Sequence, residues 1–172
     1  MSDFSENREN LIGKKFPKLD VATTKGDISL PGSFENKWFV LFSHPKDFTA
    51  ICAAEFVSFG KMYSKFKSLD CELIGLSLDS LDSHKKWTSS IYDKYDVEIE
   101  YPVISDSDGV ISSKLGILYS KDKDITVRSV FVVDGGGIIR AVLHYPPELH
   151  RDVDEIIRIV SELKKFDETS GL

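Results

Sequence analysis

The sequence predicts an α/β fold: a layered sandwich with a central mixed sheet and a hairpin near the N-terminus. Between residues 38 and 95, short apolar runs alternate with amphipathic helical patterns, as in strand-helix-strand units with parallel strands. Two further strand patterns then flank a glycine-rich turn and precede one last amphipathic helix, which adds an antiparallel pair. Parallel and antiparallel strands together indicate the mixed sheet.

The N-terminal part supplies the hairpin and the first strand-helix unit. Residues 21–30 place a turn at residues 25–27 between two short segments, after a loose start. The apolar run at residues 38–42 is short and bounded by polar residues, which is typical of a buried strand. From Cys52 to Phe66, aromatic residues recur at steps of three and four, so this segment is expected to form an amphipathic helix.

The remaining elements follow from the same periodicities. We expect strands at residues 72–78, 101–104, 126–133 and 138–144, and helices at residues 82–94, 109–115 and from about residue 152 onwards. The polar end, residues 164–172, is expected to fray. No repeat or low-complexity linker interrupts the chain, so we expect a single domain over residues 1–172.

Composition excludes several classes of protein. The 172 residues carry 22 Lys and Arg against 28 Asp and Glu, a net charge of −6 without a basic run, which argues against nucleic-acid binding. No apolar stretch approaches the roughly 20 residues of a membrane span, and the first ten residues lack a secretion signal. Two cysteines are too few for a disulfide scaffold. We therefore expect a cytoplasmic protein without membrane contact.

Cys52 stands where the first predicted strand gives way to a helix. If Thr49 is the N-cap of that helix, Cys52 occupies the third helical position. Unpaired N–H groups and the helix dipole favour an anion there, so a thiolate would be stabilised. A free cysteine on an apolar stripe more often packs as a small hydrophobic side chain, however. The helix position alone leaves both interpretations open.

The spacing of Pro45, Thr49 and Cys52, together with Arg128 on a later strand, resembles the active site of the peroxiredoxins. The segment around the motif is most similar to the one-cysteine branch of that family, which has a histidine directly before the motif proline, as His44 is here. The resemblance extends over residues 13–166, nearly the whole chain. It implies a thioredoxin-like fold and a thiol-dependent peroxidase that reduces hydrogen peroxide and organic hydroperoxides through a cysteine sulfenic acid, which an external thiol regenerates.

The resemblance also implies roles for individual residues. The catalytic set is Cys52, Thr49, Arg128 and Pro45, and the supporting set is Glu55, His44 and Arg151. For any thiol, a lower pKa raises the thiolate fraction but makes the thiolate a weaker nucleophile. The net gain in reaction rate from ionisation alone is therefore only roughly two- to threefold. One donor aimed at the developing charge contributes about 3–4 kcal/mol. We therefore rank hydrogen bonds from Arg128 above ionisation of the thiol, with Glu55 expected to position Arg128.

Departures from the family pattern concern the loop, the C-terminus and the second cysteine. Ala50 stands where the family usually has proline, and residues 53–54 stand where it has Thr-Thr or Pro-Thr. The C-terminal arm that is common in this branch is expected to be absent. The separation of Cys71 from Cys52 matches no arrangement of a resolving cysteine in the family. Cys71 is therefore expected to be a buried structural thiol. The reductant should be a small thiol or a thioredoxin-like protein. We expect a homodimer or larger homo-oligomer.

No metal or organic cofactor is expected, because His84, His144 and His150 lack the spacing and cysteine companions of a zinc site. Two alternative functions remain open. The same fold could serve as an oligomeric, chaperone-like holdase without turnover. Acyl transfer by Cys52 would need a base such as His44 oriented by a third group, and no acyl-transfer signature accompanies it.

Overall fold

A computed structural model describes residues 9–170. The predicted loose start lies partly outside the described residues, as does the end of the predicted fraying tail. The strands are β1 (Leu19–Thr23), β2 (Gly26–Leu30), β3 (Trp38–Ser43), β4 (Cys71–Ser77), β5 (Val103–Ser105), β6 (Leu118–Tyr119), β7 (Asp122–Thr126), β8 (Arg128–Val133) and β9 (Ile139–Tyr145). The helices are the 3₁₀ helix η1 (Gly32–Phe34), α1 (Ala50–Ser68), α2 (Leu81–Tyr95), α3 (Val110–Leu115) and α4 (Val153–Ser170).

Seven strands form one mixed sheet in the order β2-β1-β5-β4-β3-β8-β9. The three central strands, β5, β4 and β3, are parallel, while β8, β9, β1 and β2 add antiparallel pairs on both sides. This arrangement confirms the predicted mixed sheet and the N-terminal hairpin. Within residues 9–170, no helix is long and apolar enough to cross a membrane.

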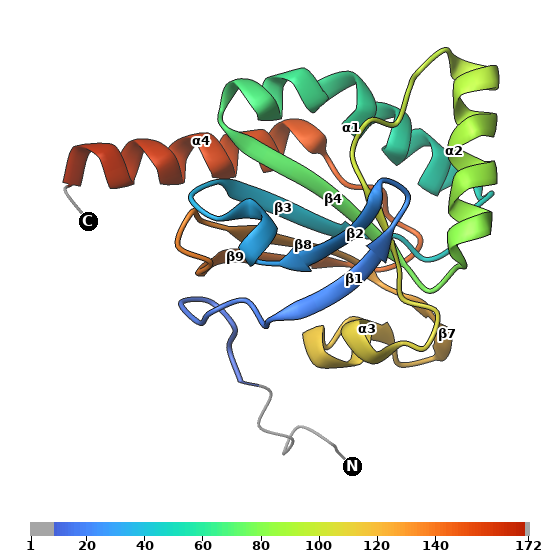
Figure 1. Ribbon diagram of the computed structural model, residues 1–172, viewed down its shortest axis with the longest axis horizontal. Helices are drawn as coiled ribbons and strands as arrows, with labels where there is room; N and C mark the ends of the chain where they lie inside the picture. The colour runs from blue at the N-terminus through green and yellow to red at the C-terminus, as the bar shows by residue number, and fades with distance from the viewer. Residues whose placement is uncertain (1–8, 171–172) are drawn as a thin grey trace.

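Both faces of the sheet are covered, which explains why β3 is buried along its whole length. Helices α1, α2 and α4 pack on one face, around a cluster that includes Phe42, Phe56 and Trp87. Figure 1 shows these three helices on one side of the sheet and α3 on the other. The second face buries Leu41 and Ile74 beneath α3 and the N-terminal segment. Burial of alternate strand residues on opposite faces therefore produces two apolar layers.

The strand order brings several chain segments to one edge of the sheet. The parallel strands β3, β4 and β5 all end there, and α1 begins just beyond the end of β3. Strand β8 runs antiparallel to β3 with Val130 opposite Phe42, so its first residue, Arg128, lies at the same edge. The end of β9 also reaches it, because Tyr145 pairs with Arg128.

The strand predicted at residues 126–133 is present as β8, which begins two residues later than predicted. β7 ends at Thr126 and pairs with β6 in a separate two-stranded sheet, whereas β8 starts at Arg128 in the main sheet. The break depends on partners elsewhere in the chain: Val127 N–H donates to Ile117 O at 2.9 Å, and the Thr126 hydroxyl donates to His44 O at 3.0 Å. An apolar pattern cannot reveal this change of partner.

Two other boundaries differ from the prediction. The hairpin turn has two residues, because Thr23 pairs with Gly26, which adopts a φ of +103°; glycine permits this conformation. Helix α4 extends to residue 170 instead of fraying from residue 164. Arg140 on β9 donates to both carboxylate oxygens of Asp167, at 2.7 and 2.9 Å, and this pair ties the last turns to the sheet.

Candidate active site

Cys52 lies in the first turn of α1, at the edge of the sheet described above. The backbone of Thr49 forms the N-cap, so Cys52 occupies the third helical position, as the sequence predicts. The side chain is fully buried on the α1 face that also carries Phe56 and Phe59. Arg128 Nη1 donates to Cys52 Sγ at 3.3 Å. A thiol 76 positions away in sequence is thus hydrogen-bonded to a buried cation.

Glu55 fixes the arginine that contacts the thiol. Its Oε1 accepts from Arg128 Nη1 at 2.5 Å and from Arg151 Nη2 at 2.9 Å. Its Oε2 accepts from the backbone N–H and Nε of Arg151, at 2.7 and 2.8 Å. Arg128 Nε also donates to Pro147 O at 2.8 Å, and Arg151 Nη1 to Ser129 O at 2.8 Å. Both guanidinium groups are therefore held in one orientation.

The cluster of Glu55, Arg128 and Arg151 carries one more positive than negative charge. Burial would raise the pKa of Glu55, but hydrogen bonds and charge from Arg151, with the charge of Arg128, outweigh burial and lower it. Two cations and one carboxylate leave one positive charge beside the sulfur. A buried cation without a partner is costly, so the charge of this cluster is complementary to an anion bound beside Arg128.

Thr49 and Pro45 lie in the loop between β3 and α1. The Thr49 hydroxyl donates to Lys46 O at 2.9 Å and makes no capping bond to the helix, so only the backbone part of the predicted cap is present. Pro45 is buried, whereas Thr49 is exposed. Phe48, between them, is 60% exposed and has a φ of +61°, a left-handed conformation that is strained for an aromatic residue.

His44 is directed toward Asp47 and α2. Its Nε2 lies 2.6 Å from Asp47 Oδ1, and its ring packs against Phe56 and Trp87. Its Nδ1 is buried without a hydrogen-bond partner among residues 9–170. Burial lowers the pKa of His44, although Asp47 partly offsets this effect. The ring is therefore held neutral, and it packs on Phe56 in the second turn of α1.

Sequence reasoning missed the cluster that His44 forms with Asp47 and His84. Their ligand-type atoms lie within 4.8 Å of one another, so the three side chains could hold a metal ion geometrically. Both histidine rings nevertheless lie at direct hydrogen-bond distance from Asp47, at 2.6 and 2.7 Å. Asp47 stands inside the recognised motif, which was the one available signal. His84 is 37 positions away, and nothing local connects it to the site.

Cys71 is remote from Cys52. It begins β4 at the far end of α1, which rises about 24 Å between Cys52 and Ser68 at 1.5 Å per residue. A disulfide requires Cα atoms about 5.5 Å apart. Burial raises the pKa of Cys71 to about 12, and both cysteines are free thiols. The position and the burial of Cys71 agree with a structural thiol.

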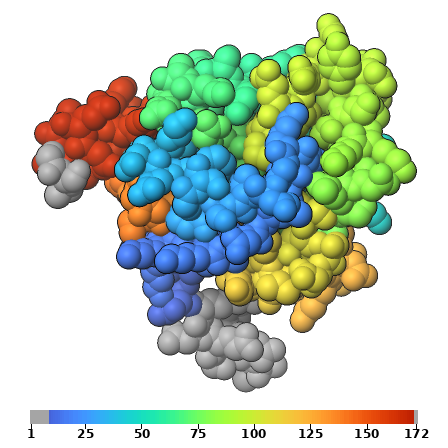
Figure 2. All heavy atoms as spheres, viewed as in Figure 1, coloured from blue at the N-terminus to red at the C-terminus, as the bar shows by residue number. Residues whose placement is uncertain are grey.

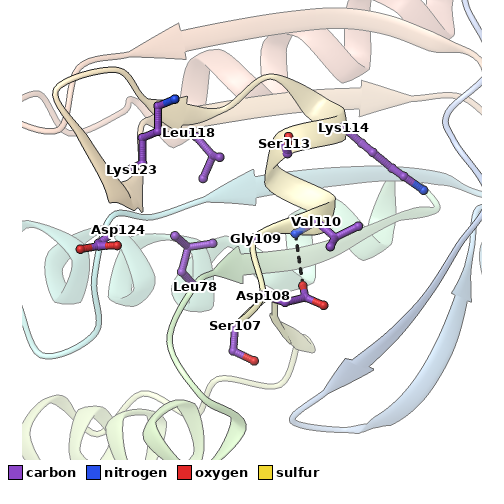
Figure 3. Close-up of a pocket in the computed structure, with 10 residues that line it drawn as sticks. All are labelled: Leu78, Ser107, Asp108, Gly109, Val110, Ser113, Lys114, Leu118, Lys123 and Asp124. Atoms are coloured by element: carbon purple, nitrogen blue, oxygen red, sulfur yellow. Dashed lines mark hydrogen bonds between the residues drawn. The ribbon is translucent and has the colours of Figure 1, made fainter.

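Two surface grooves lie away from this cluster. One of about 560 Å³ is bordered by Leu78, α3 and residues of β6 and β7, and Figure 3 shows Lys114, Lys123 and Asp124 around it. The other, of about 490 Å³, lies between the β1–β2 turn and α2, which are adjacent in Figure 2. None of the candidate catalytic residues lines either groove. The active-site assignment therefore depends on the contacts around Cys52.

Comparisons with known proteins find relatives that match most of the chain. The family model described as AhpC/TSA matches residues 12–142. A peroxiredoxin of Hyperthermus butylicus is 53% identical over 156 residues, covering 91% of this chain and 67% of the relative. A peroxiredoxin of Thermotoga petrophila is also 53% identical, over 95% of this chain and 76% of the relative. The chain thus spans about two thirds to three quarters of these relatives' length.

Solved structures show the same fold. A yeast mitochondrial 1-Cys peroxiredoxin, described for its thiol resolving mechanism via glutathione/thioredoxin systems, superposes with a TM-score of 0.88 at 31% identity, covering 94% of this chain and 80% of that one. A cysteine-to-serine mutant of peroxiredoxin 6 from Arenicola marina gives 0.84 at 29% identity, over 91% and 74%. The solved structures that resemble this chain thus include a one-cysteine member. The chain therefore belongs to the peroxiredoxin (AhpC/TSA) family of thiol peroxidases, with the thioredoxin-like fold.

Proposed function

We propose that this enzyme reduces hydrogen peroxide and organic hydroperoxides with Cys52 as nucleophile, and that an external thiol regenerates it. The observation that carries the proposal is the contact of Arg128 Nη1 with both Cys52 Sγ and Glu55. A cation shared between a thiol and a carboxylate stabilises the thiolate and fixes the direction of its own donors. No hydrogen bond within residues 9–170 occupies Arg128 Nη2, which leaves that group available to a peroxide oxygen.

In the first step, the thiolate of Cys52 attacks one peroxide oxygen. The S–O bond forms as the O–O bond breaks, so sulfur is oxidised to sulfenic acid and the peroxide is reduced to water or an alcohol. Negative charge builds on the leaving oxygen, which takes up a proton from water. Arg128 Nη2 and the hydroxyl of Thr49, which would turn from Lys46 O, are proposed to donate hydrogen bonds to this oxygen and so stabilise the charge. Pro45 stiffens the loop that presents Thr49.

In the second step, an external thiol attacks the sulfenic acid, releases water and forms a mixed disulfide with Cys52. A second thiol then displaces Cys52 as thiolate, so the two reductant thiols leave as a disulfide. Cys71 cannot serve as an internal resolving group, because α1 separates it from Cys52. Cys52 is buried, so a protein reductant requires the first turn of α1 to open, whereas a small thiol needs less displacement.

The proposal includes a cytoplasmic location and self-association into a homodimer or larger assembly. The two free thiols fit a reducing compartment. Light scattering coupled to size exclusion would measure the assembly, and a monomer at micromolar concentration would refute self-association. The holdase alternative receives no specific support from the geometry, because a holdase needs no arginine directed at a buried thiol.

The decisive experiment combines turnover with mass spectrometry. The wild type should consume hydrogen peroxide with dithiothreitol, and Cys52→Ser should not. One equivalent of peroxide should add one oxygen at Cys52, and glutathione should convert this product into a mixed disulfide. Cys71→Ser is the matched control and should behave as the wild type. Unchanged peroxide consumption by Cys52→Ser would refute the proposal, as would an intramolecular disulfide between Cys52 and Cys71.

A further inference from the structure

Asp47 is the centre of a buried network beside the active site. Its carboxylate accepts from Ser83 Oγ at 2.8 Å and lies 2.6 Å from His44 Nε2 and 2.7 Å from His84 Nδ1. Its backbone N–H donates to Asp79 Oδ2 at 3.0 Å. Asp47 belongs to the loop between β3 and α1, whereas Ser83 and His84 belong to α2. The network therefore joins the active-site loop to α2 by hydrogen bonds. Among the described residues, no residue of α2 is hydrogen-bonded to Cys52, whose partner is Arg128.

His84 bridges Asp47 and strand β5 through its two ring nitrogens. Its Nε2 lies 3.0 Å from Ile104 O, and a carbonyl only accepts, so Nε2 carries a proton. Its Nδ1 faces Asp47 Oδ2, which also only accepts when ionised. Burial would raise the pKa of Asp47, but hydrogen bonds from His44 and His84 outweigh it and hold the pKa well below its usual range. His84 therefore connects Asp47 to strand β5 through two buried contacts.

The network is connected to the reacting groups through a very short stretch of chain. Phe48 follows Asp47 directly and adopts the left-handed conformation, and Thr49 follows Phe48 at the N-cap. A strained, exposed aromatic residue keeps such a conformation only if its neighbours are fixed on both sides. On one side, the fixed neighbour is Asp47. On the other side, it is helix α1 with Cys52.

We propose that Ser83 and His84, acting through Asp47, are positioning residues for peroxide reduction. They hold the loop so that Thr49 and the first turn of α1 keep the geometry that the peroxide requires. This inference rests on the proposed peroxidase function and adds a requirement that lies on α2. Reaction rates are sensitive to such geometry, since a displacement of about 1 Å can cost about 100-fold.

Two substitutions of His84 test the proposal against a merely structural role. His84→Asn keeps a donor near Nδ1, toward Asp47, and loses the bond to Ile104 O. His84→Gln keeps a donor near Nε2, toward Ile104 O, and loses the bond to Asp47. Each removes the ring and one buried hydrogen bond, so their losses of thermal stability should be similar. The rate constant for hydrogen peroxide should fall about 10- to 100-fold in His84→Gln and stay within about threefold of wild type in His84→Asn.

A second reaction distinguishes misplacement of the peroxide from loss of the thiolate. Alkylation of Cys52 by iodoacetamide needs no polarised O–O bond, so its rate in His84→Gln should remain unchanged or rise as the loop loosens. If peroxide reduction and alkylation slow equally, or if both His84 variants reduce peroxide at the same rate, the positioning role is refuted. Failure of the wild type itself to reduce peroxide would instead refute the proposed function.

A milder pair of variants decides the matter if His84→Gln does not fold. Ser83→Ala removes only the hydroxyl that donates to Asp47. The matched control is Ser90→Ala on the same helix, whose hydroxyl donates to Trp87 O at 2.7 Å. Ser83→Ala should slow peroxide reduction about three- to tenfold without slowing alkylation, and Ser90→Ala should leave both rates unchanged. Equal peroxide rates in the two serine variants would overturn the proposal.

Discussion

Glu55→Gln should be the most damaging isosteric substitution in the active site. Glu55 accepts four hydrogen bonds from two buried guanidinium groups and one backbone N–H, at 2.5 to 2.9 Å. Glutamine preserves the shape but removes the negative charge and replaces one acceptor oxygen with an amino group that faces donors. Arg128 and Arg151 would then be two buried cations without a carboxylate between them. Breaking a buried ion pair in this way costs about 3–5 kcal/mol.

That cost is a large part of the roughly 5–15 kcal/mol by which a domain is usually stable. Equilibrium unfolding in urea, followed by circular dichroism at neutral pH, would measure it as a lower midpoint at constant slope. The peroxide rate constant should also fall about 100-fold, because Arg128 loses the group that orients its Nη1. Both losses should occur in the same variant.

The matched control is Glu155→Gln on α4. Glu155 also forms a two-bond pair with an arginine, with Arg158 Nε and Nη2 at 2.7 and 2.8 Å, but this pair is exposed to solvent. Exposed pairs contribute little, so this variant should unfold almost as the wild type does. If Glu55→Gln lowered the free energy of unfolding by less than about 1 kcal/mol, the cost assigned to breaking the buried pairs of Glu55 with Arg128 and Arg151 would be wrong.

Four further outcomes are expected. Arg128→Lys keeps the charge but loses the paired Nη1 and Nη2 donors, so stopped-flow measurements should show peroxide reduction slowed about 100- to 1,000-fold. A loss below about tenfold would contradict the role of these two donors. Thr49→Val should slow the same reaction at least about tenfold with little change in stability, and Thr49→Ser should restore it. Cys71 should resist iodoacetamide at about pH 8 until denaturant unfolds the chain, since burial raises its pKa to about 12; mass mapping would expose any earlier labelling. Burial lowers the pKa of His44 from 6.5, so below pH 6.5 the unfolded chain binds a proton that the folded chain does not, and stability should fall as the pH drops. Urea unfolding between about pH 7 and 5 should show a shallower decline in His44→Gln; equal slopes would contradict a neutral His44.

Local patterns predicted much of the fold because they depend on residues within a few positions of one another. The buried strand β3 was predicted at residues 38–42, because a short apolar run has few other structures available. The steps of three and four that follow Cys52 located α1 to within two residues at each end. The start of β8 at Arg128 could not be located in this way, because the break between β7 and β8 depends on partners elsewhere in the chain.

By itself, the sequence determined that Cys52 stands in the first turn of a helix directly after a buried strand, because helix and strand periodicities are local. Only the tertiary structure decided which groups meet there. Arg128 and Arg151 reach Glu55 across 73 and 96 positions, and His84 reaches Asp47 across 37. These contacts follow from the strand order, which brings the ends of β3 and β9, the start of β8 and the start of α1 to one edge. No local periodicity encodes that order, since it depends on packing between whole elements.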